Sequence, residues 1–108
     1  MKTYPFVTDN GQIKAFEISN AFFWAPGTMR RVLESVEGVT NVRRIWFSDD
    51  RYSFIFRGHR CVVNEPWGDN SMYWIGPEQM EPPVDMTPVH EAFRRYRFPL
   101  TFDRESRG

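Results

Sequence analysis

The sequence predicts an α+β domain: an antiparallel sheet of five to six strands with two helices, in the order β-β-α-β-β-β-β-α. In two segments, apolar residues recur every three to four positions, the spacing of a helix with one buried face. Elsewhere, β-branched and aromatic residues alternate with polar ones between short turn signals, which indicates antiparallel strands. The length of 108 residues fits one domain. We expect that domain to span residues 1–100, with residues 101–108 as a loose C-terminal tail.

The first half of the chain predicts a hairpin followed by a helix. Residues 3–8 and 12–19 are rich in strand-forming side chains, and Asn10-Gly11 between them is the strongest short hairpin signal. Thr28 follows a Pro-Gly break and is a favourable N-cap, and Gly38 stands where a helix C′ glycine is expected. Between these two residues lies one apolar stripe at i, i+3, i+4 and i+7: Met29, Val32, Leu33 and Val36. We expect this first helix to cover one face of the sheet.

The second half predicts four more strands and a second helix. Short turns separate the strand segments, so a meander is the simplest topology. The segments are residues 41–47, 52–57, 60–65 and 72–75. Residues 78–85 are acidic and contain two adjacent prolines, which indicates an extended linker. A helix then begins with Thr87 as N-cap and Pro88 at the first helical position. Its apolar stripe is Val89, Ala92, Phe93 and Tyr96.

Composition and missing motifs exclude several classes of function. The fourteen basic and fourteen acidic side chains cancel, so no net charge attracts nucleic acid or an anionic membrane. The single cysteine, Cys61, excludes an internal disulfide and a cysteine-based zinc site. The sequence has no Gly-rich phosphate loop and no metal-binding spacing, so we expect no cofactor and no metal. The first residues lack the apolar segment of a signal peptide, and the longest apolar run is too short to cross a bilayer, which favours a soluble cytoplasmic protein.

The densest chemistry lies between residues 65 and 77, where aromatic and polar side chains crowd one turn. We call its candidate binding residues the aromatic turn: Glu65, Trp67, Asp69, Asn70, Tyr73 and Trp74. Tryptophan and tyrosine have flat apolar rings with polar tips and are enriched at recognition sites. A structural interpretation competes with this one. In it, Trp67 and one of the other two rings fill the core, while Asp69 and Asn70 close the turn through backbone hydrogen bonds.

Three functional hypotheses follow, and we favour the first. It is a non-enzymatic binding or protein-interaction domain that uses the aromatic turn, with residues 22–24 as a further aromatic contact patch. The second is a small-molecule enzyme with a carboxylate-lined cleft formed by Glu65 and Asp69, with His59 nearby. The third is a weak nucleic-acid binder that uses the arginines of the second helix, Arg94, Arg95 and Arg97. The expected partner is an unidentified protein or small ligand, not nucleic acid or a membrane, and the chain is expected to be a monomer or homodimer.

Four blocks of the sequence carry a resemblance: Ala15–Ile18, Gly38–Val42, Glu65–Ser71 and Tyr73–Pro77. In these blocks the chain resembles a family of small uncharacterised bacterial proteins of about this length. The likeness covers most of the chain, and no activity is assigned to that family. The resemblance implies a bacterial, soluble, self-contained domain, and it transfers neither a function nor a site.

Overall fold

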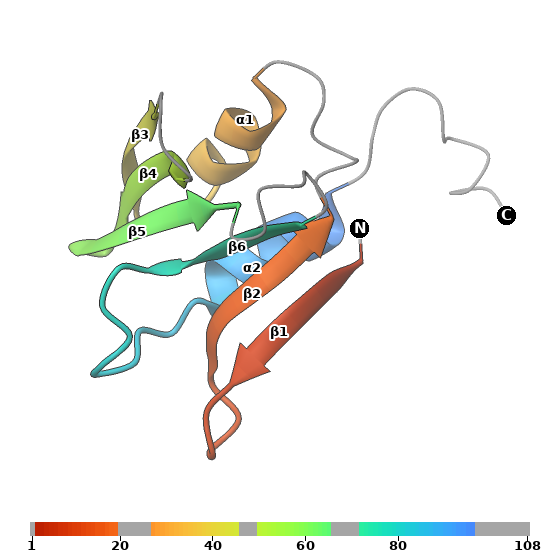
Figure 1. The fold of residues 1–108 in the computed structure, drawn as a ribbon, viewed down its shortest axis with the longest axis vertical. Helices are drawn as coiled ribbons and strands as arrows, with labels where there is room; N and C mark the ends of the chain where they lie inside the picture. Colours follow the sequence, from red (N-terminus) through yellow and green to blue (C-terminus); the bar gives the residue numbers. More distant parts are fainter. Residues whose placement is uncertain (1, 20–26, 46–49, 66–71, 97–108) are drawn as a thin grey trace, which may run out of the picture.

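The sheet and the helices have the predicted order. The structure is a computed structural model that describes residues 2–19, 27–45, 50–65 and 72–96. Within these residues it contains two helices and one antiparallel sheet in the order β-β-α-β-β-β-β-α, and the sheet has six strands rather than five (Figure 1). The elements are β1 (Thr3–Val7), β2 (Ile13–Ser19), α1 (Thr28–Glu34), β3 (Val39–Arg44), β4 (Asp50–Phe56), β5 (His59–Asn64), β6 (Met72–Pro77) and α2 (Thr87–Arg95).

The strands form two locally paired units. Across the sheet, the strand order is β1-β2-β6-β5-β4-β3. β1 and β2 form a hairpin, and β3 to β6 form a meander in which each strand pairs with the next. The two units join where β2 pairs with β6. The predicted meander is therefore correct for β3 to β6, whereas the chain segment that contains α1 leads from β2 to the far edge of the sheet at β3.

Two turns set the register of the hairpins. Thr8 N–H donates to the carbonyl of Gln12 and Gly11 N–H donates to the carbonyl of Thr8, at 2.8 and 2.9 Å. Of the residues in this turn, Gly11 has a positive φ of 88°. The loop is therefore the three residues 9–11 that lie between the two predicted strands, and of the Asn10-Gly11 pair only the glycine is left-handed. Between β4 and β5, Arg57 and Gly58 have φ values of 51° and 86°, as a two-residue type I′ turn requires.

The predicted N-caps, Thr28 and Thr87, are each wrong by one residue because both are already helical. Gly27 precedes α1, and Met86 precedes α2, and neither N-cap makes a side-chain capping bond. Asp85 partly replaces the missing cap of α2, since its Oδ1 accepts the Thr87 N–H at 3.0 Å. Sequence alone identified the start of each helix to within one position.

α1 ends earlier than predicted, at Glu34. Ser35 is the C-cap, and its hydroxyl donates to the Val32 carbonyl at 2.6 Å, which satisfies one of the carbonyls at the helix end. Gly38, expected as the C′ residue, instead lies directly before β3 with a φ of 95°. The glycine is still needed for a left-handed backbone, but it turns the chain into a strand rather than ending the helix.

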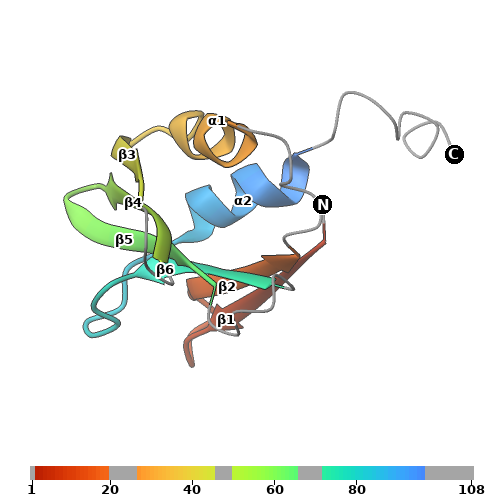
Figure 2. The same cartoon turned by 45° about the horizontal axis from the view of Figure 1, so that its top comes forward.

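Both helices lie on one side of the sheet (Figure 2). α2 packs on β1 and β2, α1 packs on β3, and the two helices also contact each other. The first helix covers part of this face, as expected, but α1 has only seven residues and α2 has nine. The two helices share the face, and the core fills the space between them and the strands.

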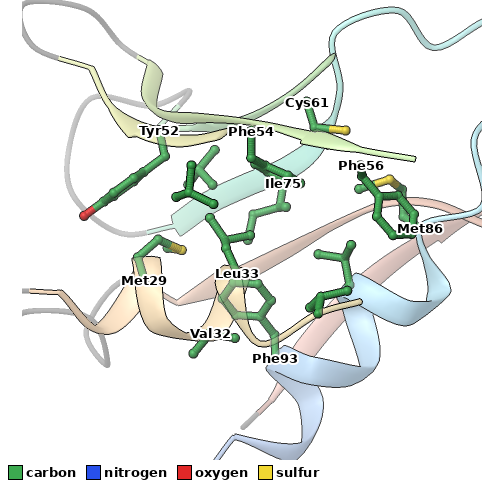
Figure 3. Close-up of a cluster of buried hydrophobic side chains, with 14 of the residues drawn as sticks. Met29, Val32, Leu33, Tyr52, Phe54, Phe56, Cys61, Ile75, Met86 and Phe93 are labelled. Carbon is green, nitrogen blue, oxygen red and sulfur yellow. The ribbon is translucent and has the colours of Figure 1, made fainter. Parts of the chain in front are cut away.

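The predicted apolar stripes form this core. All four residues of the first predicted stripe are buried, although Val36 lies just after the end of α1. Of the second stripe, Val89 and Phe93 are fully buried, and Ala92 and Tyr96, the C-cap of α2, are partly buried. Figure 3 shows side chains from both helices and from β4, β5 and β6 converging in one cluster. The helix face chosen from the period of the sequence is therefore confirmed.

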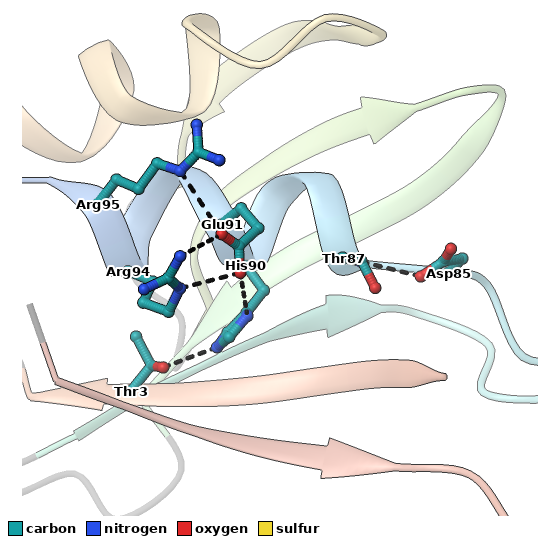
Figure 4. Close-up of polar contacts among 7 residues, drawn as sticks. All are labelled: Thr3, Asp85, Thr87, His90, Glu91, Arg94 and Arg95. Atoms are coloured by element: carbon teal, nitrogen blue, oxygen red, sulfur yellow. Dashed lines mark hydrogen bonds and ion pairs between the residues drawn. The ribbon is translucent and has the colours of Figure 1, made fainter. Parts of the chain in front are cut away.

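A polar residue, His90, is buried in the same layer and ties α2 to the edge strand. It is 5 % exposed, and its Nε2 lies 2.7 Å from Thr3 Oγ1 of β1 (Figure 4). The Phe16 ring meets the imidazole edge-on, with 5.1 Å between the ring centres. Burial lowers the pKa of His90; the charge of Glu91 opposes this effect, and that of Arg94 adds to it. The neutral imidazole is therefore the form that the fold favours.

We expect His90 to make the protein less stable in mild acid. Because the pKa of His90 is lowered in the folded protein, the unfolded chain takes up a proton more readily. The stabilisation is complete above the ordinary pKa of about 6.5 and is lost as the pH falls through the folded value. His90→Phe should remove this part of the pH dependence. Urea unfolding at about pH 7.5 and about pH 5.5 measures it, and an equal loss of stability in both proteins on acidification would contradict the assignment.

Candidate binding surface

The structure separates the described members of the aromatic turn. Glu65 follows β5, and Tyr73 and Trp74 are adjacent in β6. Adjacent residues of a strand point to opposite faces of the sheet. Tyr73 lies on the helix side with Ile75, where it packs against the core, so Trp74 faces away from the helices. Outside the described residues lie Trp67, Asp69, Asn70 and residues 22–24.

Glu65 is held in a buried ion pair on the helix side of the sheet. It is 1 % exposed, and both Nε and Nη2 of Arg51 lie 2.6 Å from its Oε1. Its other oxygen, Oε2, has no hydrogen-bond partner among the described residues. Burial first, and then the charge of Glu65, raise the pKa of the Tyr73 hydroxyl. The ion pair joins the start of β4 to the end of β5, which gives Glu65 a role in the fold.

The sheet face opposite the helices carries no helix in the described part of the chain, and we call it the open face (Figure 2). Its side chains alternate with the buried residues of each strand, so all six strands contribute to it. Among them are Tyr4, Phe6, Ala15, Glu17, Trp74, Gly76, Val62, Arg60, Ser53 and Arg43. Tyr4 and Phe6 are 44 % and 41 % exposed, which is unusual for large apolar side chains and marks this face as a candidate contact surface.

Trp74 lies flat on the open face because the neighbouring side chains are small. A Cβ atom on Gly76 would come 2.7 Å from Cη2 of Trp74 and 2.9 Å from Cβ of Ala15. The indole therefore occupies the space that a side chain at position 76 would fill, and it leaves Ala15 and Gly76 buried while staying partly exposed itself. Glu17 pairs with Tyr4 on one side and with Trp74 on the other. The result is an aromatic half of the open face, on β1, β2 and β6, that surrounds one carboxylate.

The other half of the open face, on β5, β4 and β3, carries two exposed arginines, Arg43 and Arg60, and we call it the arginine half. It contains a shallow hollow of about 530 Å³, lined chiefly by Asn41, Arg43, Ser53, Ile55, Arg60 and Glu78. Arg60 lies 3.6 Å from Glu78, and both side chains are exposed, so water screens this pair. Arg43 is exposed and has no ion-pair partner among the described residues. A guanidinium is thus available on this half for an outside partner.

The described residues do not gather a catalytic or metal site. His59 begins β5 and Glu65 follows its last residue, so about six residues of about 3.3 Å, roughly 20 Å, separate them. Burial raises the pKa of the Cys61 thiol to about 12, which keeps the sulfur unreactive. No group of three or more His, Cys, Asp or Glu side chains in this part of the chain is placed to hold a metal ion.

The described arginines of α2 are paired with an acid of their own helix. Nε and Nη2 of Arg94 lie 2.9 and 2.6 Å from the two carboxylate oxygens of Glu91, and Nε of Arg95 lies 3.5 Å from the same group (Figure 4). The hydrogen bond from Arg94 lowers the pKa of Glu91. Local compensation of charge weakens the attraction of this helix for phosphates. Arg97, the third arginine of that hypothesis, lies outside the described residues.

Most residues of the open face were missed by reasoning from the sequence, although two signals in it point there. Glu17 stands between Phe16 and Ile18, so strand alternation alone places its carboxylate on the opposite face from the core. Gly76 interrupts a strand, which often marks the close approach of another group. Arg43 and Tyr4 carry no such signal, because the segments that contain them show no clear alternation of apolar and polar residues.

A side chain at position 76 should push Trp74 off the open face. We expect Gly76→Ala to lower the free energy of unfolding by about 1–3 kcal/mol, the usual cost of overpacking. The same substitution should cost less in a Trp74→Ala background, because one of the two close contacts is then gone. Chemical denaturation of the two single variants and the double variant measures this coupling. Strictly additive losses would show that the indole does not lie over Gly76.

No protein family, curated protein or solved structure matches this chain. The resemblance to small bacterial proteins therefore stays a prediction. Within the described residues, neither helix is long and apolar enough to cross a membrane. A functional conclusion has to rest on the chemistry of the surface itself.

Proposed function

We propose that this chain is a non-enzymatic protein-interaction domain whose contact surface is the open face. The observation that carries the proposal is the position of Trp74, a partly exposed indole lying flat over Gly76 with Tyr4 and Phe6 exposed on the same face. Aromatic and arginine side chains are the residues most enriched at the centres of protein interfaces. Both kinds are present here, on one continuous sheet surface with no helix among the described residues to cover it.

The open face shares only part of the aromatic turn that the sequence predicted as the binding site. Trp74 belongs to both, whereas Glu65 and Tyr73 lie on the helix side, where they support packing. Within the described residues, no observation favours the enzyme hypothesis, because Glu65 is bound by Arg51 and is far from His59 along β5. The pairing of Arg94 and Arg95 with Glu91 likewise gives no support to a nucleic-acid site on α2.

Site-specific photocrosslinking tests this proposal. A benzophenone amino acid at Tyr4 places the reactive group on the open face, and the same amino acid at Arg31, exposed on α1, is the control on the helix side. We expect discrete protein adducts from position 4 after irradiation in cells that make the protein, few or none from position 31, and loss of the adducts with Trp74→Ala. Thermal melts confirm that each variant is folded. Absence of adducts from position 4, or equal adducts from both positions, would contradict the proposal.

A further inference from the structure

We infer that the open face binds a second copy of this chain, with the aromatic half of each copy against the arginine half of the other. This inference rests on the proposed function and names its partner. It follows from the way in which charge and aromatic area are divided across the sheet. On the aromatic half, Tyr4 and Phe6 lie on β1, and Glu17 and Trp74 lie on β2 and β6. On the arginine half, Arg43 lies on β3 and Arg60 lies on β5.

The two halves are chemically complementary. A guanidinium stacks on aromatic faces and pairs with carboxylates, and the aromatic half offers both. Within the chain, one cation lies over a ring of this half, since the Nζ of Lys2 is 5.8 Å from the centre of the Tyr4 ring. Glu17 and Arg43 have no ion-pair partner among the described residues, so each has a free charge that the other half of a second copy would meet.

The two copies face each other and are related by a two-fold axis that runs parallel to the strands, between the middles of the two sheets. The aromatic half of each copy then faces the arginine half of the other. Such an axis places β1 of one copy over β3 of the other, because the strand order runs from β1 to β3 across the sheet. One row of paired residues spans that width and contains Phe6, Ala15, Gly76, Val62, Ser53 and Arg43. In the dimer, Arg43 then lies over Phe6 of the second copy, within a diagonal step of Glu17. The same contact occurs at both ends, as a closed symmetric interface requires.

Face-to-face contact is favoured over strand addition at the edge. β1 is an edge strand, and Tyr4, Phe6 and Val7 are its exposed apolar residues. Pro5 stands at the centre of β1 and has no N–H to donate, a device that keeps edge strands from pairing with other chains. The exposed rings of β1 therefore need a partner that covers their faces rather than one that extends the sheet.

The size of the open face limits the strength of the dimer. Six strands about 4.8 Å apart, each about five residues of about 3.3 Å long, make a flat area of roughly 500 Å². Two such faces bury about 1,000 Å², the lower limit of a specific interface. We therefore expect a reversible dimer with a dissociation constant of about 1–100 μM rather than a permanent one.

Sedimentation velocity with a charge-reversal pair tests the inference. Wild-type protein at about 5 to 500 μM should shift from the monomer of 12.9 kDa to a dimer as its concentration rises. Glu17→Arg and Arg43→Glu should each weaken the dimer about tenfold or more, and the double variant should return to within about threefold of wild type. Arg31→Glu, on the exposed side of α1, is the matched control and should change nothing.

Three outcomes would overturn the inference: monomer at every concentration, a dimer that ignores both single reversals, or no rescue in the double variant. The photocrosslinking at Tyr4 separates this failure from that of the proposed function. Adducts at twice the chain mass support a second copy. Adducts of another mass from a protein that stays monomeric keep the open face as a contact surface but assign it to a different partner.

Discussion

Leu33→Ala should lower the free energy of unfolding by about 2–5 kcal/mol, the range for truncating a buried leucine. Leu33 is fully buried, and it projects from α1 into the cluster formed by the sheet and both helices (Figure 3). Its removal leaves a cavity that the short helix α1 cannot close by shifting, since α1 also contacts β3 and α2. For a domain whose total stability is about 5–15 kcal/mol, this is a large share.

Glu34→Ala is the matched control, one residue along the same helix. Glu34 is exposed, and its ion pair with Arg30 spans 3.4 Å, so its loss should cost well under about 1 kcal/mol. Urea denaturation of both variants provides the comparison. Similar losses in the two variants would mean that the buried face of α1 has been misassigned.

The second large loss of stability is expected when the buried ion pair between Arg51 and Glu65 is broken. Arg51→Ala leaves the 1 % exposed Glu65 carboxylate without its cation, which typically costs about 3–5 kcal/mol for a fully buried pair. The Arg51 side chain is 35 % exposed, so water can partly replace it, and we expect about 2–3 kcal/mol. Arg51→Met with Glu65→Leu should recover much of this loss, because no buried charge is then left unpaired.

Arg60→Ala supplies the comparison for an exposed pair. Arg60 and Glu78 are 79 % and 40 % exposed, and removing this arginine should change stability by less than about 1 kcal/mol. Thermal and urea unfolding of dilute protein measures all of these variants. An Arg51→Ala loss no larger than that of Arg60→Ala would show that Glu65 is not sealed from water.

The sequence predicted the elements of this fold far better than their neighbours in space. Helical and strand periods depend on local spacing, so the stripe from Met29 to Val36 and the alternation of β4 were visible directly. The hairpin turn was placed correctly, but of the Asn10-Gly11 pair only Gly11 takes the left-handed conformation. Both N-caps were misplaced by one residue, since local hydroxyl preference does not fix where the helical backbone starts.

The candidate site was harder to predict because it depends on pairing between distant segments. Residues 65–77 are close in sequence, yet Tyr73 and Trp74 point to opposite faces of β6. Glu17 and Trp74 are far apart in the chain, yet they are directly paired partners. The buried His90 was also hidden, since a histidine on an otherwise amphipathic helix gives no sign of the Thr3 hydroxyl that binds it.

The order of the strands also bears on how this chain folds. Pairing within the β1–β2 hairpin and within the β3–β6 meander closes only short loops, and such local contacts form early. The seam between β2 and β6 is different, since it brings Phe16 to Ile75 across most of the chain and carries a larger entropy of loop closure. Before the seam forms, the strands on both sides of it expose an edge. We therefore expect the pairing of β2 with β6 to limit the rate of folding, so that substitutions along this seam slow folding more than equally destabilising ones in the two turns.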